Sequence, residues 1–420
     1  MQKYFLLLFT VLLSATAATA QDPFQPYLNG EAPRIIKELG ETTQGNVKIR
    51  ELVFHSRDVQ TPEGSVPNEI FAAIVRPLAP GKYPGLMVYH GGGGNAEINR
   101  AKRWAAQGYI VMVLDEPGVA NPEKVSEFTT GAWKKYKYAA NRFRVTPDAS
   151  ASTIFEGVLA SLQALYLLRA QPDVIKDRIG ITGVSWGGYM TTMISSLANK
   201  YIRASFSVYG SGFYDEGSAF QKELNAIAPA DRETWLKYLD AGRRVRSIRT
   251  PFFLAAAAND FFFHPPAVMK TLLSMKNGQV NHLFGPNASH KILLLGGNMK
   301  PDSMRPGSVE MELAWFDYYL KDKGQPMPVV TKAEQQSGAF RFRVKSPLPV
   351  TDAKVYYSFA DTTWPKRVWV PIAAAPVGNG WYTAAIPAET DGKVFDWYAN
   401  VSDARPVSAS SYIMRSKQVK

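Results

Sequence analysis

The sequence predicts an α/β protein, in which a mostly parallel sheet flanked by helices is followed by a small all-β sandwich. Between residues 83 and 321, short apolar runs that suit buried strands alternate with segments of helical period. After Pro326-Met327-Pro328 the helical period ends, and short strand candidates separated by Pro and Gly turns fill about 90 residues. We therefore expect a leader at 1–20, an α/β domain at 21–330 and an Ig-like β-sandwich domain at 331–420.

The first twenty residues have the pattern of a secretory signal peptide. Lys3 gives a positive start, an apolar run fills 4–13, and Ala18-Thr19-Ala20 is a small-x-small cleavage site. The sequence contains no Cys, which excludes a lipoprotein anchor, and no other apolar run approaches the roughly 20 residues that a membrane span needs. We expect a mature chain that begins near Gln21, is periplasmic or secreted, and has no membrane span.

Composition limits the partners and the chemistry. Without Cys, the 420-residue chain forgoes disulfides, thiolate metal sites and a Cys nucleophile, so its stability must come from a large core. The formal net charge of +12 indicates either an ordinary basic surface or attraction to acidic polymers. No nucleic-acid-binding motif accompanies the charge, so we expect no nucleic-acid partner. No pattern indicates an oligomeric state.

The expected elements follow in chain order. The predicted strands of the α/β part are 49–54, 69–76, 85–89, 109–114, one around residues 179–181, 204–209, 251–258 and 280–284. The predicted helices are 95–107, 154–171, 189–197 and 309–320, and a partly helical insertion is expected at 213–249. The strand candidates of the sandwich are 340–344, 354–359, 367–371, 381–386, 394–401 and 411–414.

A strand, a sharp turn and a helix meet at 178–197. The turn, Gly183-Val184-Ser185-Trp186-Gly187, is a G-x-S-x-G motif in the context that a nucleophile elbow requires. There the serine takes a strained backbone conformation that lifts its hydroxyl above the sheet, and its neighbours two before and two after must lack a Cβ. Ser185 is therefore the predicted nucleophile, and the N-terminus of the following helix faces the developing negative charge.

A glycine run, His90-Gly91-Gly92-Gly93-Gly94, directly follows the strand predicted at 85–89. Glycines let backbone N–H groups approach a ligand closely. In enzymes with a nucleophile elbow, a loop in this place supplies one oxyanion donor and the residue after the nucleophile supplies the other. The predicted donors are Gly91 or Gly92, together with Trp186. A phosphate cradle fits less well, because no Gly-Lys-Ser/Thr follows.

A serine hydroxyl needs an adjacent base, and the base needs a carboxylate that orients it. Only a histidine on a loop at the carboxyl edge of the sheet can reach Ser185. His290 lies on such a loop after the last strand and is the predicted base, with His264 as the alternative. The remaining histidines have less suitable places, with His55 before the core sheet, His90 in the glycine loop and His282 inside a strand. Asp260, at the end of the preceding strand, is the predicted acid.

The order Ser185, Asp260, His290 is that of α/β-hydrolases. The sequence resembles this superfamily, and most of all its exported dienelactone-hydrolase, acetylxylan-esterase and prolyl-oligopeptidase-type branch. The matching segments are 90–93, 183–190, 258–265, 289–290 and 315–320. The resemblance implies a Ser-His-Asp hydrolase with no cofactor, and it does not fix the substrate. We expect no metal, and a small-molecule or carbohydrate ester as the partner.

Three functions remain open at this stage. The first is an exported carboxylic ester hydrolase, with acylated glycans among its substrates. The second is a serine peptidase or amidase, which the Gly-Gly-Tyr-Met after Ser185 favours. Such peptidases carry a large N-terminal β-propeller, and the roughly 60 residues before the first parallel strand leave no room for one. The third is a glycan-binding protein with a vestigial hydrolase domain. Segments 121–148 and 232–249 are rich in Lys and Arg, and 121–148 is either a solvated loop or a cap over the site.

Overall fold

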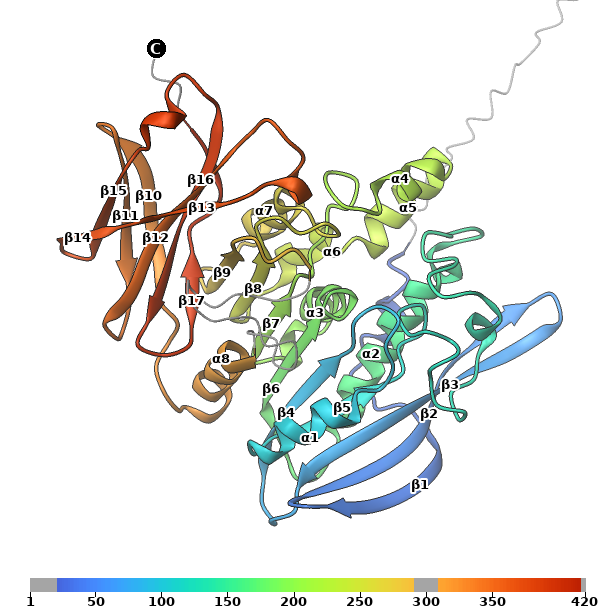
Figure 1. Ribbon diagram of the computed structural model, residues 1–420. Helices are drawn as coiled ribbons and strands as arrows, with labels where there is room; N and C mark the ends of the chain where they lie inside the picture. Colours follow the sequence, from blue (N-terminus) through green and yellow to red (C-terminus); the bar gives the residue numbers. More distant parts are fainter. Residues whose placement is uncertain (1–20, 291–308, 417–420) are drawn as a thin grey trace, which may run out of the picture.

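The computed structural model describes residues 21–290 and 309–416. Its largest element is a nine-stranded sheet in the order β1-β2-β3-β5-β4-β6-β7-β8-β9 (Figure 1). The strands are β1 (Ile35–Gln44), β2 (Val47–Thr61), β3 (Gly64–Pro77), β4 (Tyr83–Tyr89), β5 (Ile110–Leu114), β6 (Val174–Val184), β7 (Ala204–Val208), β8 (Phe252–Ala257) and β9 (Val280–Gly285). The first four in sheet order pair antiparallel, and from β5 to β9 all neighbours run parallel.

Helices cover both faces of this sheet. One face carries α1 (Ile98–Ala106) and α8 (Val309–Lys321), which touch each other where the rings of Trp104 and Phe316 meet at 5.9 Å. The other face carries α2 (Thr153–Arg169), α3 (Trp186–Leu197) and α7 (Pro265–Ser274). A mixed sheet between two helical layers confirms the predicted α/β fold class.

The insertion expected at 213–249 is helical in three short pieces between β7 and β8. They are α4 (Gln221–Ala226), α5 (Pro229–Leu239) and α6 (Ala241–Arg244). Buried Trp235 and Tyr214, with ring centroids 5.6 Å apart, join this insertion to the loop that follows β7. The insertion is thus packed close to the carboxyl edge of the sheet.

Residues 329–416, called here the C-terminal β region, form two antiparallel sheets, as predicted for a β sandwich (Figure 1). The first sheet contains β10 (Val329–Gln336), β11 (Ala339–Lys345), β15 (Trp381–Ala385) and β14 (Ala375–Gly378). The second contains β13 (Val370–Ala373), β12 (Val350–Phe359), β16 (Phe395–Asp403), β17 (Ser408–Ser410) and β18 (Met414–Arg415). Phe340, Val355 and Trp397 belong to a separate core cluster of this region. Because β10 begins at Val329, the predicted boundary at 330/331 falls inside its first strand.

The structure adds elements that the sequence patterns did not predict. β1 is mostly exposed and pairs with a β2 that is much longer than the predicted 49–54, while β10 and β14 extend the first sheet of the C-terminal β region. The predicted leader 1–20 lies outside the described residues. In the described part of the chain, no helix combines the length and apolar character that crossing a membrane requires.

The C-terminal β region lies against β9, the last strand of the large sheet. Phe284 of β9 donates its N–H to Ser410 Oγ at 2.9 Å and accepts from Asn400 Nδ2 at 3.4 Å. At the other end of the strand, Asn281 donates to the carbonyl of Pro328 at 2.9 Å. Side chains outside the sheet therefore satisfy backbone groups at the outer edge of β9.

Candidate active site

Ser185 lies in the turn between β6 and α3 and has the strained conformation expected of an elbow, with φ 60° and ψ −117°. Its N–H donates to the carbonyl of Val208 at 2.8 Å, which ties the turn to the end of β7. A Cβ on Gly183 would lie 2.3 Å from the carbonyl oxygen of Gly187, and one on Gly187 would lie 2.4 Å from that of Tyr89. The two glycines therefore let α3 pack tightly against β6 and against the end of β4.

His290 connects Ser185 to Asp260. Its Nδ1 lies 2.8 Å from Asp260 Oδ2, and its Nε2 lies 2.8 Å from Ser185 Oγ. The carboxylate can only accept, so Nδ1–H donates to Asp260 and the lone pair of Nε2 accepts the Ser185 hydroxyl proton. The structure thus brings together the three residues that the sequence selected, from the ends of β6, β8 and β9.

Asp260 is completely buried, and each of its oxygens is used. Oδ1 accepts the backbone N–H groups of Phe262 and Phe263 at 2.7 and 2.9 Å, which leaves Oδ2 for His290. The two backbone bonds fix the plane of the carboxylate. The imidazole therefore meets an acceptor whose orientation is set before any substrate binds.

Four aromatic rings, none of which was among the predicted site residues, surround His290. Tyr209, Phe262, Phe261 and Phe263 have ring centroids 4.7, 4.8, 5.6 and 5.7 Å from the imidazole. They shield the His290–Asp260 hydrogen bond from water, which strengthens it. The run of three Phe directly after Asp260 was a visible sequence signal for this enclosure. Tyr209, from the end of β7, had none.

The glycine loop approaches the elbow as predicted, and His90 holds it there. Buried His90 donates Nδ1–H to the carbonyl of Gly91 at 2.8 Å, and its Nε2 accepts the N–H of Glu116 at 3.2 Å. Within the described residues, the N–H groups of Gly91, Gly92 and Trp186 have no hydrogen-bond partner. Three free backbone donors on the two segments that meet at Ser185 fit the requirements of an oxyanion hole.

Burial keeps the groups behind this loop neutral. Desolvation lowers the pKa of His90, so its imidazole stays uncharged, in agreement with one ring nitrogen donating and the other accepting. Desolvation also raises the pKa of Glu116 well above its usual range, with the Ser161 hydroxyl at 3.1 Å as a hydrogen-bond donor that opposes the shift. The wall behind the glycine loop thus contributes little charge to the site.

The other histidines are placed away from the nucleophile. His264, the alternative base, caps α7, and its ring bonds the backbone of Phe261. His282 is buried in β9 and stacks on Tyr412 of the C-terminal β region at 4.5 Å. His55 lies near Asp58 on β2, with 3.6 Å between Nε2 and Oδ1. The geometry therefore gives the base position to His290.

Segment 121–148 is solvated in part, with Lys135 to Tyr138 exposed, but several of its side chains anchor it beside the site. Trp133, Arg142 and Phe143 are all buried. The Arg142 guanidinium lies between the rings of Trp186 and Tyr138, 4.5 and 4.7 Å from their centroids. The Tyr138 hydroxyl lies so close to Gly92 that a Cβ there would be 2.3 Å away. Segment 121–148 thus forms a wall beside the free N–H groups.

Two of the basic residues of segment 232–249, Arg243 and Arg244, are paired with carboxylates. Arg243 makes a bidentate contact with Asp215 at 3.1 and 2.8 Å, and Arg244 does the same with Asp22 at 2.8 and 3.1 Å. Arg243 also lies 3.3 Å from buried Asp240. The positive field expected over the site from this segment is therefore weaker than its residue count indicates.

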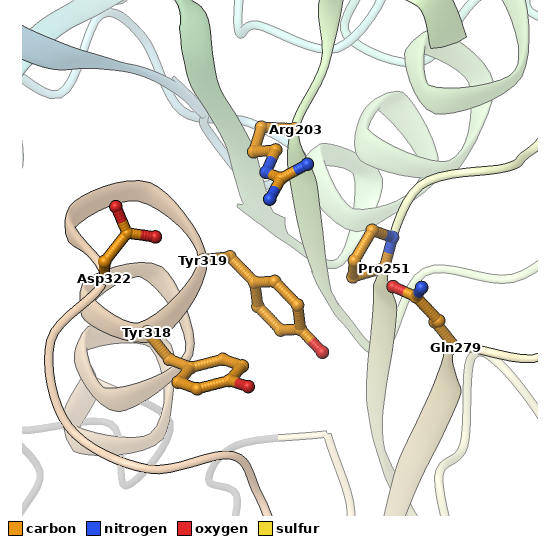
Figure 2. Close-up of a pocket in the computed structure, with 6 residues that line it drawn as sticks. All are labelled: Arg203, Pro251, Gln279, Tyr318, Tyr319 and Asp322. Carbon is orange, nitrogen blue, oxygen red and sulfur yellow. The ribbon is translucent and has the colours of Figure 1, made fainter.

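The six residues drawn in Figure 2 line a hollow at the opposite edge of the sheet. The hollow has a volume of about 440 Å³. Arg203, Pro251 and Gln279, which line it, directly precede β7, β8 and β9, whereas Ser185, Asp260 and His290 follow strands. The hollow is therefore separate from the Ser185 site. Among the described residues, no group of three or more His, Asp or Glu side chains is arranged to hold a metal ion.

Comparison with known proteins agrees with this architecture. The model of the dienelactone hydrolase family matches residues 70–291, just over half of the chain. Acetyl xylan esterase 1 from Thermoanaerobacterium sp. JW/SL YS485 is 19% identical, with 70% of this chain and 92% of that chain covered and a TM-score of 0.53. Acetyl xylan esterase from Paenibacillus sp. R4 is 16% identical, with the same coverage and a TM-score of 0.51. At such identities the likeness shows a shared fold. No curated protein that was compared matches the sequence.

Proposed function

The chain belongs to the dienelactone hydrolase family and is a hydrolase, and from this premise we propose that it cleaves carboxylic esters through Ser185, His290 and Asp260. The observation that carries the proposal is the position of His290, 2.8 Å from both Ser185 Oγ and Asp260 Oδ2. A hydroxyl, an imidazole and a buried carboxylate in this order suit acyl transfer, because the imidazole takes the hydroxyl proton and the carboxylate orients the imidazole without becoming protonated.

In the proposed reaction, Ser185 Oγ attacks the ester carbonyl while Nε2 of His290 takes its proton. Asp260 holds the imidazole by Nδ1–H and stabilises the cation that forms. The tetrahedral intermediate collapses to an acyl-enzyme as His290 returns the proton to the leaving alcohol, and water then repeats the sequence to release the acid. The N–H groups of Trp186 and of Gly91 or Gly92 bind the oxyanion, and one such donor is worth about 2.7–4 kcal/mol.

We propose an ester substrate over a peptide for a mechanistic reason. An alkoxide needs modest help to leave, whereas an amide nitrogen must be fully protonated and the peptide held on both sides of the scissile bond. The ring of Tyr138, which is 40% exposed and lies beside Gly92, offers a flat surface that suits a sugar or a small acyl group. Acylated glycans are therefore the proposed substrate class, as the names of the two structural neighbours also suggest.

The test compares matched ester and amide substrates. We expect measurable kcat/KM on p-nitrophenyl acetate and at least about 100-fold less on acetyl, alanyl and prolyl p-nitroanilides, which corresponds to about 2.7 kcal/mol of transition-state discrimination. Ser185→Ala should abolish turnover and fluorophosphonate labelling while the thermal unfolding midpoint is retained. Full labelling of this variant would place the nucleophile elsewhere, and comparable rates on an anilide would make the protein a peptidase.

We also propose that the enzyme is exported. Support comes from the positive, apolar and small-x-small regions of residues 1–20. Amino-terminal sequencing of protein from the periplasm or the medium should find a chain that begins near Gln21. Recovery of the uncleaved chain from the cytoplasm alone would contradict export.

A further inference from the structure

The loops that carry Asp260 and His290 both contact the same residue of the C-terminal β region. Trp369, which is 1% exposed, donates its indole Nε1–H to the carbonyl of Ala258 at 3.0 Å. Its backbone N–H donates to Asn287 Oδ1 at 2.8 Å, and its carbonyl accepts from Asn287 Nδ2 at 2.9 Å. Ala258 is two residues before Asp260, and Asn287 is three residues before His290.

The contacts hold a turn that contains two left-handed residues. Asn287 and Ser289 have φ of 52° and 54°. Asn adopts this conformation more readily than most residues, whereas for Ser289 it is uncommon and needs support from its surroundings. Ser289 is held by its N–H, which donates to Asn259 Oδ1 at 2.8 Å. Asn287 is held by its two bonds to the Trp369 backbone. The turn that presents His290 therefore depends on one contact within the large sheet and one from outside it.

Trp369 is itself held rigidly from the C-terminal β region. Its ring packs edge-on against Tyr398 of β16, with 5.0 Å between centroids and 70° between planes. Tyr398 is fully buried and stacks on Tyr356 of β12 at 5.5 Å. Trp369 thus contacts both loops, through its indole at Ala258 and through its backbone at Asn287, which fixes their separation.

We propose that Trp369 and Asn287 are positioning residues for the reaction, so that the C-terminal β region completes the geometry of the His290–Asp260 pair. The inference rests on the proposed function for its kinetic consequence, but the geometry it describes can be measured without any substrate. A displacement of about 1 Å at a reacting centre costs about 100-fold in rate. Loosening either contact should therefore lower kcat and leave binding of a small ester nearly unchanged.

The kinetic experiment uses the full chain and two variants. Asn287→Gly removes both bonds to Trp369 while tolerating the positive φ, and Trp369→Phe keeps an aromatic ring while removing the indole donor. The matched control is Asn281→Ala, which removes a side-chain amide bond from β9 to Pro328 at the opposite end of the same strand. We expect Asn287→Gly and Trp369→Phe to lower kcat on p-nitrophenyl acetate about 10- to 100-fold with KM changed less than about threefold. Asn281→Ala should keep kcat even where it lowers the thermal unfolding midpoint.

A second readout separates this proposal from the proposed function. The proton shared by His290 Nδ1 and Asp260 should give a low-field ¹H NMR signal in the wild type, and His290→Gln should remove it. We expect Asn287→Gly to broaden or shift this signal and Asn281→Ala to leave it unchanged. An unchanged signal and kcat in Asn287→Gly, or an equal loss of kcat in the control, would overturn the positioning role. A wild type that shows the signal but neither hydrolyses esters nor reacts with fluorophosphonate would overturn the proposed function and leave the positioning result standing.

Discussion

Gly187→Ala tests whether the close approach of α3 to β4 sets the catalytic geometry. The added Cβ would lie 2.4 Å from the carbonyl oxygen of Tyr89 and 2.8 Å from that of His90, and both atoms are backbone. Ordinary van der Waals contact begins near 3.4 Å, so the elbow and the glycine loop must separate by about 1 Å. Overpacking of this kind costs about 1–3 kcal/mol of stability. The same displacement of the oxyanion donors from Ser185 should lower kcat/KM about 100-fold, or about 2.7 kcal/mol of transition-state stabilisation.

The assay is hydrolysis of p-nitrophenyl acetate together with thermal unfolding, and Gly217→Ala is the control. Gly217 is also buried, but a Cβ there would have its nearest neighbour, Cβ of His264, at an ordinary 3.5 Å. The control should keep kcat/KM within about threefold of wild type. If Gly187→Ala retains both wild-type kcat/KM and stability, or if Gly217→Ala loses as much, then backbone contact at the elbow does not determine the geometry of the site.

Three further predictions concern buried ionisable side chains. Because burial raises the pKa of Glu116 far above 4.5, the folded carboxyl stays protonated while the unfolded one ionises, so wild-type stability falls as pH rises above about 4.5. Glu116→Gln should remove that loss, so the unfolding midpoint of the variant minus that of wild type should increase from pH 5 to pH 8. A difference that stays constant over this range would show that Glu116 is ionised in the folded protein. Burial lowers the pKa of His282 from 6.5 to about 4, so wild type should lose about 3 kcal/mol between pH 7 and pH 4 in urea unfolding, and His282→Gln should lack this slope. An equal slope in both proteins would refute this assignment. Asp396 pairs with buried Arg367 and with Arg415, so Asp396→Ala should cost about 3–5 kcal/mol of unfolding free energy, and Arg367→Met with Asp396→Leu should recover most of it. If Asp396→Ala is as stable as wild type, then the ion pair between Arg367 and Asp396 is exposed to solvent.

The parts that could be predicted from the sequence are those with a local signal. The apolar runs of β4 to β9 and the G-x-S-x-G turn identify strands and nucleophile from a few adjacent residues. Asp260 and His290 follow because the carboxyl ends of parallel strands meet at one edge, which turns three distant positions into one site. β1 escaped prediction because most of its residues are exposed and its alternation is weak.

The parts that could not be predicted depend on long-range pairing. Trp369 contacts residues 82 and 111 positions away, and no local pattern marks a tryptophan for such a place. The ion pair between Arg244 and Asp22 spans 222 positions, so a count of basic residues overstated the field of segment 232–249. The aromatic enclosure of His290 could be predicted in part. The run Phe261 to Phe263 is visible in the sequence, but the orientation of its rings toward His290 is not.

The two ends of the large sheet are protected against intermolecular strand pairing in different ways. β1 carries exposed charged residues such as Glu38 and Glu41 and has two irregularities in its register, which disfavour addition of another strand. β9 is regular and buried, and its outer backbone groups are occupied by Ser410 and Asn400. Removal of the C-terminal β region would leave an apolar strand with free hydrogen-bonding groups at the surface, which is a template for edge-to-edge association. A chain truncated before Val329 should therefore self-associate through β9, whether or not Ser185, Asp260 and His290 remain in place.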